Sequence, residues 1–351
     1  MTQNVALVAG ASGIIGKALI EELRDRTDWH VRALARRGDK LVQTVLADLT
    51  DREGTRAALD AAAASDTTHV FYAAYASGGG LAEEDATNGA MLRNLLDGLE
   101  NIGARLDRVV LYQGAKIYGV HLGPVRSPFY EDDNPRHLGP NFYQTQEAEL
   151  IARRAAGRHD WSILRPDVVI GDAAGNAMNI ATVIGAYAAI CRASGAAFRF
   201  PGSEKVYRHV FAQLTDSRAL ARASLWAAKS PAAAGEAFNY VHEPFRWERV
   251  WTRLAIDLEL SLGPPLPISL AEHMPLQADL WAKLASEQQI ADVPYEKAVG
   301  WRFGDFVFGA EFDVVSDMLK IRQAGFTETV DSYNALLDAI RRQQAAGIIP
   351  R

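Results

Sequence analysis

Three residues in the middle of the chain have side chains suited to acid–base chemistry. Lys116 and Tyr118 follow Arg108–Gln113, an apolar run typical of a buried strand, and Tyr143 lies at the start of the next helical pattern. Ligands of parallel sheets bind beyond the carboxyl ends of the strands, where Lys116 and Tyr118 fall. A tyrosine O–H can stabilise an oxygen that gains negative charge, and a nearby ammonium lowers the pKa of that tyrosine. Taken singly, each residue has a plainer interpretation: packing for Tyr143 and Tyr118, and solvation for Lys116.

A glycine-rich turn near the start of the chain is suited to hold an anion. Gly10, Gly13 and Gly16 follow the apolar run Val5–Ala9 and lead into a helical pattern at Lys17. The first glycine permits a tight turn, the second a close approach to a pyrophosphate, and the third close packing of helix on strand. The helix N-terminus adds free N–H groups and a partial positive charge. The turn predicts a dinucleotide site; the alternative is a glycine-rich connector in another α/β protein.

The residues after the second expected strand indicate which dinucleotide is preferred. Arg36 and Arg37 follow the strand pattern Trp29–Ala35, where this kind of fold contacts the adenosine ribose. An acidic residue there would bind the 2′-hydroxyl of NAD, whereas two arginines suit the 2′-phosphate of NADP. We therefore expect NADPH to be favoured, the alternative being two solvated surface arginines. Asp48, after a third short strand, is expected at the adenine edge.

Strand and helix patterns alternate through the first half of the chain. The expected strands begin at Val5, Trp29, Val45, Thr68, Arg108 and Trp161. The alternation predicts an α/β fold with a Rossmann-type, doubly wound parallel sheet. Residues 121–140 are expected to form a loop over the site. Beyond about residue 171 the alternation ends and the pattern becomes mostly helical. One helix in this part, at 216–228, is expected to return to the sheet.

This pattern also suggests how the chain is divided. We expect an NADP-binding Rossmann domain over residues 1–170, rejoined by a segment at about 205–243. A smaller, mostly helical substrate-binding region is expected over about 171–204 and 244–351.

Composition narrows the function classes. The chain has 351 residues, 48% of them hydrophobic and 23% charged, which suits a globular protein with a substantial core. The net charge of −6 argues against a protein that tracks nucleic-acid phosphates. The single cysteine, Cys191, excludes a disulfide framework and a cysteine-based zinc site, so no metal is expected. We see no apolar stretch suited to span a bilayer and no signal peptide, and expect a cytoplasmic enzyme.

A set of motifs spread over nearly the whole chain resembles one known family. The motifs are Ala33–Arg37, Thr68–Tyr72, Gly114–Tyr118, Asn141–Tyr143, Trp161–Pro166, Met178–Asn179, Tyr187–Cys191, Phe200–Gly202, Ala237–Asn239 and Ser316–Phe326. They resemble those of the extended short-chain dehydrogenases/reductases, and among these the progesterone 5β-reductase and iridoid synthase-like (PRISE) enone reductases. The resemblance implies a Rossmann-type fold, NADPH as cofactor and a small-molecule enone as substrate.

The position of the lysine distinguishes between groups within this superfamily. Extended members usually carry Tyr-x-x-x-Lys on a helix, but the residue four past Tyr143 is Glu147. Tyr112 does have Lys116 four residues on, but at a strand end, where that spacing does not place both side chains on one helical face. PRISE-like enzymes carry the lysine on the preceding loop, as Lys116 is placed here. Further departures from the family, which leave pocket shape and substrate open, are Gln113, Gln144, Ala148 and Ile117.

The resemblance implies roles for individual residues. Tyr143 and Lys116 match the catalytic pair, and Phe326, together with Tyr118, is assigned to the substrate. Cofactor contacts are expected from Gly10, Ser12, Gly13, Ile14, Gly16, Arg36, Arg37, Asp48, Leu49, Ala74, Tyr112, Tyr143, Val169, Asn176, Ala177 and Met178.

The predicted reaction is 1,4-reduction of an α,β-unsaturated carbonyl compound. Hydride from NADPH would reach the β-carbon, Tyr143 would stabilise the enolate oxygen, and Lys116 would assist. The alternatives are a carbonyl (1,2-) reductase, a sugar-nucleotide epimerase or dehydratase, and a non-enzymatic NADPH-sensing module. The missing helical lysine counts against the epimerase. Steroid enones, small cyclic enones and linear dialdehydes stay open as substrates, as does assembly into a homodimer.

Overall fold

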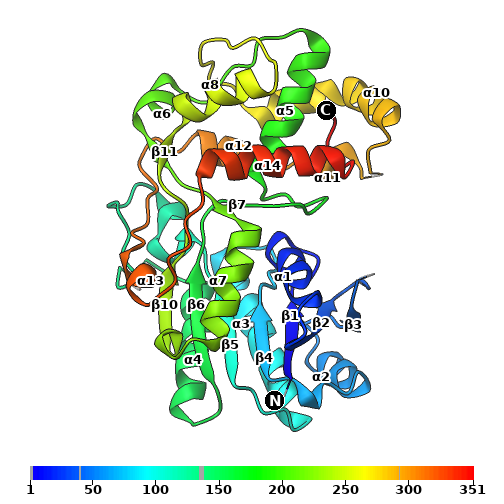
Figure 1. Cartoon of the computed structure of the whole chain (residues 1–351), viewed down its shortest axis with the longest axis vertical. Coiled ribbons are helices and arrows are strands. Elements are labelled where there is room, and N and C mark those ends of the chain that lie inside the picture. Colours follow the sequence, from blue (N-terminus) through cyan, green and yellow to red (C-terminus); the bar gives the residue numbers. More distant parts are fainter. Residues whose placement is uncertain (1–2, 39–40, 134–137, 292) are drawn as a thin grey trace.

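A seven-stranded parallel sheet forms the lower half of the molecule in the computed structural model, which describes residues 3–38, 41–133, 138–291 and 293–351 (Figure 1). The strand order is β10-β6-β5-β4-β1-β2-β3, and every neighbouring pair is parallel. The strands are β1 (Asn4–Ala9), β2 (Trp29–Ala35), β3 (Gln43–Leu46), β4 (His69–Tyr72), β5 (Arg108–Tyr112), β6 (Asp160–Arg165) and β10 (Glu236–Asn239). The chain therefore winds outward in both directions from β1, as the sequence predicts.

Helices cover both faces of this sheet. One face carries α1 (Ile14–Arg24) and α7 (Ser217–Lys229), whose apolar side chains pack on Val8, Phe71 and Val110. The other face carries α2 (Arg52–Ala61), α3 (Leu81–Asn101) and α4 (Phe142–Ala155), which pack on the alternate residues of the same strands. The strands are apolar on both faces because both are buried.

The upper half is built mainly from helices (Figure 1). These are α5 (Ile180–Ser194), α6 (Glu204–His209), α8 (Trp247–Asp257), α9 (Leu270–His273), α10 (Ala278–Gln288), α11 (Tyr295–Ala298), α12 (Trp301–Phe308) and α14 (Ser332–Ala345). Helix α5 is buried on all sides from Ile180 to Cys191 and forms the centre of their shared core. Helix α13 (Leu319–Gln323) lies apart from them, beside β10.

Short elements join the two halves. Strand β7 (Val169–Ile170) pairs with β9 (Thr215–Asp216), and β8 (Phe211–Ala212) pairs with β11 (Phe245–Arg246). Just after β7, Gly171 accepts hydrogen bonds from Asn179 and from Gln343 of α14, each 2.8 Å long. A Cβ added at Gly171 would stand 2.7 Å from Ile14, the first residue of α1. The helical half therefore meets the glycine-rich turn directly.

Several details differ from the sequence expectation. Helix α3 begins at Leu81 instead of Asn88, because Gly80 caps it and Glu83 and Glu84 occupy its favourable first turn. Strand β10 is an addition that the sequence pattern did not reveal. Residues 134–137 of the expected loop lie outside the described residues.

The described residues contain neither a membrane-spanning helix nor a cluster of metal ligands. No described helix is both long and apolar enough to span a bilayer. Within the same ranges, no group of three or more His, Cys, Asp or Glu side chains is arranged to hold a metal ion. The predicted cytoplasmic location stays a prediction.

Candidate active site

The glycine-rich turn adopts a conformation that larger residues would disrupt. Gly10 has φ +81°, and a Cβ there would lie 2.5 Å from the Ala73 carbonyl oxygen. A Cβ at Gly16 would lie 2.3 Å from the Gly10 carbonyl oxygen. Gly13 precedes α1 without any side-chain cap, and the first turn of the helix holds no acidic residue. The amide groups at the start of α1 are thus left for an anion, which fits the phosphates of a dinucleotide.

The two arginines lie where β2 leaves the sheet. Arg36 and Arg37 are exposed just beyond the last residue of β2. The Asp48 carboxylate accepts hydrogen bonds from the amide and hydroxyl of Thr50, at 3.0 and 2.7 Å. These bonds, with the charge of Arg36 adding to them, lower the pKa of Asp48. Asp48 therefore stands ionised near Arg36, and Leu49 after it is buried in the core.

The other expected cofactor residues lie in varied surroundings. Ser12 is exposed, Ile14 is buried, and Ala74 and Val169 are partly exposed. Asn176, Ala177 and Met178 form a surface turn in which the Asn176 side chain accepts a 2.9 Å hydrogen bond from the Met178 amide. Their contacts with a cofactor stay predictions.

Tyr112 is the expected cofactor residue that lies deepest in the core. Its hydroxyl donates a 2.8 Å hydrogen bond to Ser224 of α7, and its burial raises its pKa. The side chain is thus committed to packing under α7. Only the Tyr112 backbone, at the end of β5, lies at the edge of the sheet where a cofactor contact is expected.

Tyr143 stands in the first turn of α4. Asn141 caps this helix by accepting a 3.1 Å hydrogen bond from the Tyr143 amide, and its NH₂ group donates to the Lys116 carbonyl at 2.9 Å. The start of α4 is therefore tied to the turn Ala115–Tyr118 that follows β5. A Cβ added at Gly114 would lie 3.4 Å from the Tyr143 hydroxyl, so the phenol lies directly beside this glycine.

The Tyr143 phenol keeps its proton at neutral pH. Burial raises its pKa to about 12, the charges of Asp167 and Glu84 add to the rise, and the Gly114 amide partly offsets it. Even so, the side chain keeps some exposed surface. Tyr143 is thus a hydrogen-bond donor that a ligand can reach.

The Lys116 side chain is paired with the carboxylate of Glu84. Its ammonium forms an ion pair with Glu84 of α3 and lies 5.0 Å from the centre of the Phe142 ring. Among the described residues no hydrogen bond joins it to Tyr143. Burial alone would raise the pKa of Glu84, but hydrogen bonds from Lys116 and Tyr75 outweigh that effect and lower it. The two expected catalytic groups share one edge of the sheet, and the Phe142 ring lies near both of them.

A buried ion pair includes Glu147, the residue four positions after Tyr143. Glu147 pairs with Arg165 of β6 at 3.2 Å, and their side chains are 11% and 2% exposed. Gln113 bridges the pair, accepting from Arg165 at 2.8 Å and donating to Glu147 at 3.1 Å. Its NH₂ group also donates to the Tyr143 carbonyl at 3.0 Å. The network therefore fixes the helix turn that carries Tyr143.

Tyr118 belongs to the same network. Its hydroxyl accepts a 3.1 Å hydrogen bond from Arg165 and donates to Asn239 of β10. Its ring stacks on Phe129 with the centres 4.9 Å apart, and burial raises its pKa to about 12. The structure therefore gives Tyr118 a packing role, and a contact with substrate stays a prediction.

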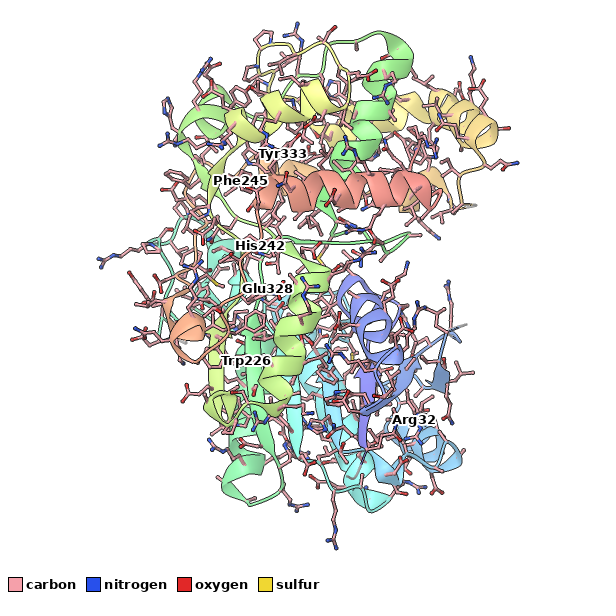
Figure 2. All side chains as sticks on the ribbon, viewed as in Figure 1. Arg32, Trp226, His242, Phe245, Glu328 and Tyr333 are labelled. Atoms are coloured by element: carbon pink, nitrogen blue, oxygen red, sulfur yellow. The ribbon has the colours of Figure 1, made fainter. Side chains whose placement is uncertain are left out.

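Phe326 packs on the side of the sheet that α7 covers. Its ring contacts Trp226 of α7 and Tyr240, both with centres 5.6 Å away, and Figure 2 shows Trp226 on that helix. Tyr118 and Tyr143 belong to a different apolar cluster, around Ala115 and Ile117. The substrate role of Phe326 also stays a prediction.

Sequence reasoning missed three residues of this site. Glu84 holds Lys116, Gln113 holds the Tyr143 backbone, and Asp167 lies near the Tyr143 phenol. Only Asp167 carried a usable signal, because a carboxylate directly after β6 falls at the carboxyl edge of the sheet.

Comparisons with known proteins agree with this architecture. Residues 38–350 match the model of a family described as PRISE-like Rossmann-fold domain. The chain belongs to this PRISE-like family. It is 32% identical to a 3-oxo-Δ(4,5)-steroid 5-β-reductase of Arabidopsis thaliana, over 99% of this chain and 94% of the relative. It is 30% identical to the (S)-8-oxocitronellyl enol synthase CYC2 of Camptotheca acuminata, over the same shares.

Solved structures show the same fold. A short-chain dehydrogenase/reductase superfamily protein of Agrobacterium tumefaciens with bound NAD superposes with a TM-score of 0.65 at 19% identity, covering 98% of both chains. The predicted family and Rossmann-type fold are confirmed for this PRISE-like protein. So is its assignment as an oxidoreductase, since its relatives are named as reductases and synthases.

Proposed function

We propose that this PRISE-like protein reduces the activated C=C bond of α,β-unsaturated carbonyl compounds with NADPH. The observation that carries the proposal is the Tyr143 phenol, which stays protonated and reachable at the carboxyl edge of the sheet. A neutral phenol there can donate to a carbonyl oxygen and stabilise the enolate that forms when the β-carbon is reduced. Protonation of the α-carbon by solvent then completes the reduction.

Lys116 assists this donor electrostatically. Its ammonium lies against the Phe142 ring, whose centre is 4.2 Å from that of Tyr143. A positive charge at this edge favours negative charge on the substrate oxygen. Glu84 holds the ammonium in place and offsets part of its charge.

The residues present fit a nicotinamide dinucleotide. Gly10 and Gly16 have no room for a Cβ, so the turn keeps its tight, glycine-dependent shape. The uncapped amides at the start of α1 suit the pyrophosphate. Exposed Arg36 and Arg37 suit a ribose 2′-phosphate, which supports NADPH over NADH. When bound, the reduced nicotinamide supplies the hydride.

The substrate class follows from chemistry that two relatives share. Their names refer to a 3-oxo-Δ(4,5)-steroid and to an 8-oxocitronellyl enol. We extend to this chain only an activated C=C bond beside a carbonyl group, on a small molecule. We also retain the division into a cofactor-binding domain, residues 1–170 with about 205–243, and a substrate-binding region formed by the rest.

NADPH oxidation with a panel of enones, followed by product identification, tests the proposal. We expect saturated carbonyl products and a strong loss of kcat in Tyr143→Phe with NADPH affinity nearly unchanged. Tyr240→Phe is the matched control, because the Tyr240 hydroxyl is buried without a partner in the described structure. Allylic alcohols would instead indicate 1,2-reduction. NADPH binding without turnover on any enone would indicate a sensing module.

A further inference from the structure

The ion pair between Lys116 and Glu84 lies inside the candidate active site, and the proposed reaction uses only its lysine. The two side chains are 21% and 13% exposed. The Lys116 ammonium lies 5.0 Å from the centre of the Phe142 ring, and that ring packs on Tyr143 with the ring centres 4.2 Å apart. A carboxylate of the protein is therefore held beside the phenol that is proposed to bind the substrate oxygen.

The Glu84 carboxylate is held through both of its oxygens. One oxygen accepts a hydrogen bond from Lys116, and the other accepts a 2.5 Å hydrogen bond from the hydroxyl of Tyr75, which follows β4. The Glu84 carbonyl accepts a 2.8 Å hydrogen bond from the side chain of Asn88, which also bonds to the amide and the carbonyl of Ala76. Backbone and side chain are both anchored, so Glu84 is a preoriented partner for the ammonium.

Two neighbouring groups add no free positive charge to this part of the site. Burial, together with the charge of Lys116, lowers the pKa of His121, so its ring is neutral at pH 7. Arg165, in the network that holds the Tyr143 helix turn, is paired with Glu147. The positive charge that Lys116 brings to this edge of the sheet is therefore largely compensated by Glu84.

This compensation matters for any substrate that carries its own carboxylate. An unpaired, partly buried ammonium would bind such a group through a charge-assisted hydrogen bond. Here Glu84 already occupies the ammonium, so a substrate carboxylate would be desolvated without a free partner and would meet a like charge. A neutral enone needs only a donor for its carbonyl oxygen, and Tyr143 supplies that donor.

We propose that Glu84 is a specificity-determining residue, which occupies the Lys116 ammonium and so excludes enones that carry a carboxylate beside the reacting carbonyl group. The inference rests on the proposed enone reduction and narrows its substrate class to neutral enones. Glu84 takes no part in the bond changes of that reaction. Without its charge, Lys116 becomes available to the carboxylate of an unsaturated 2-oxo acid whose ketone binds Tyr143.

A matched pair of substrates tests this selection: trans-benzylidenepyruvate, whose carboxylate adjoins the enone carbonyl, and its neutral methyl ester. The readout is the ratio of kcat/KM for the acid to kcat/KM for the ester, with NADPH. The intrinsic reactivities of the two compounds cancel when this ratio is compared between variants, and a general disturbance of the site lowers both values alike. Glu84→Gln, which keeps the size of the side chain and an acceptor for Tyr75, should raise the ratio on the order of 10-fold or more.

Two further variants define the origin of that rise. Glu83→Gln removes the same charge from the exposed neighbouring position in the first turn of α3 and should keep the wild-type ratio. Adding Lys116→Met to Glu84→Gln should cancel the rise, because the freed ammonium is then absent. A rise that persists without Lys116, or one of equal size in Glu83→Gln, would overturn the assignment.

Equilibrium binding separates this inference from the proposed function. The saturated counterparts, 4-phenyl-2-oxobutanoate and its methyl ester, need only bind to the NADP⁺-bound protein. If no enone is reduced but Glu84→Gln raises the affinity for the acid relative to the ester, and Lys116→Met cancels that rise, the proposed function fails and the charge selection stands. If enones are reduced but Glu84→Gln changes neither the kcat/KM ratio nor the affinity ratio, the role of Glu84 in selection is refuted.

Discussion

Replacing Glu147 by glutamine probes the buried ion pair that Glu147 forms with Arg165. The substitution keeps the size of the side chain and its hydrogen bonds with Gln113 and Arg165 but removes the charge. Arg165, only 2% exposed, then keeps its positive charge but loses its paired carboxylate. Removing one partner of a buried ion pair costs about 3–5 kcal/mol. Because glutamine keeps the hydrogen bonds, we expect the lower end, about 3 kcal/mol of unfolding free energy.

Denaturant unfolding measures this cost, with Glu53→Gln as the matched control. Glu53 pairs with Arg56 on a helix surface and is 78% exposed, so its loss should cost less than about 0.5 kcal/mol. Because Gln113 links the pair to the Tyr143 backbone, Glu147→Gln should also lower kcat of enone reduction. A Glu147→Gln protein within about 1 kcal/mol of the wild type would refute the assignment of a buried, charge-dependent network.

Three further predictions follow from the structure. Replacing Arg36 and Arg37 by alanine should weaken NADPH by about 1.5–3 kcal/mol per lost phosphate bond and leave NADH nearly unchanged; an equal loss of both would remove the 2′-phosphate assignment. Burial lowers the pKa of His69 and of His242 to about 4 (Figure 2 labels His242), so the unfolded chain takes up protons first below pH 6.5. Unfolding free energy should therefore fall between pH 6.5 and 4, by roughly 3 kcal/mol for each histidine, and replacing either by glutamine should flatten that fall. Gly10→Ala should abolish cofactor binding or folding, since its φ of +81° and the 2.5 Å approach to Ala73 admit no side chain, and calorimetry with NADPH would reveal normal binding if this is wrong.

The sequence was informative where the structure depends on local patterns. Strands β1 and β2 and the turn at Gly10 are encoded by short apolar runs and by glycines with a steric reason to be there. The end of β2 could be placed because Arg36 and Arg37 follow it directly. These features need no knowledge of distant parts of the chain.

Features that depend on distant contacts could not be predicted. Strand β10 has four residues and becomes a strand only by pairing with β6, more than 70 positions earlier. Glu84 and Lys116 meet across 32 positions, so no local pattern showed that the lysine has a partner. Glu147 was noted as a missing lysine, but its pairing with Arg165 depends on how α4 packs against β6.

The most direct test of the central claim is the position of the label after reduction of an enone with NADPH deuterated at C4 of the nicotinamide. Stabilisation of an enolate by Tyr143 predicts deuterium on the β-carbon of a saturated carbonyl product, and loss of that product in Tyr143→Phe. Deuterium on the hydroxyl-bearing carbon of an allylic alcohol, which was the carbonyl carbon of the enone, would contradict the account.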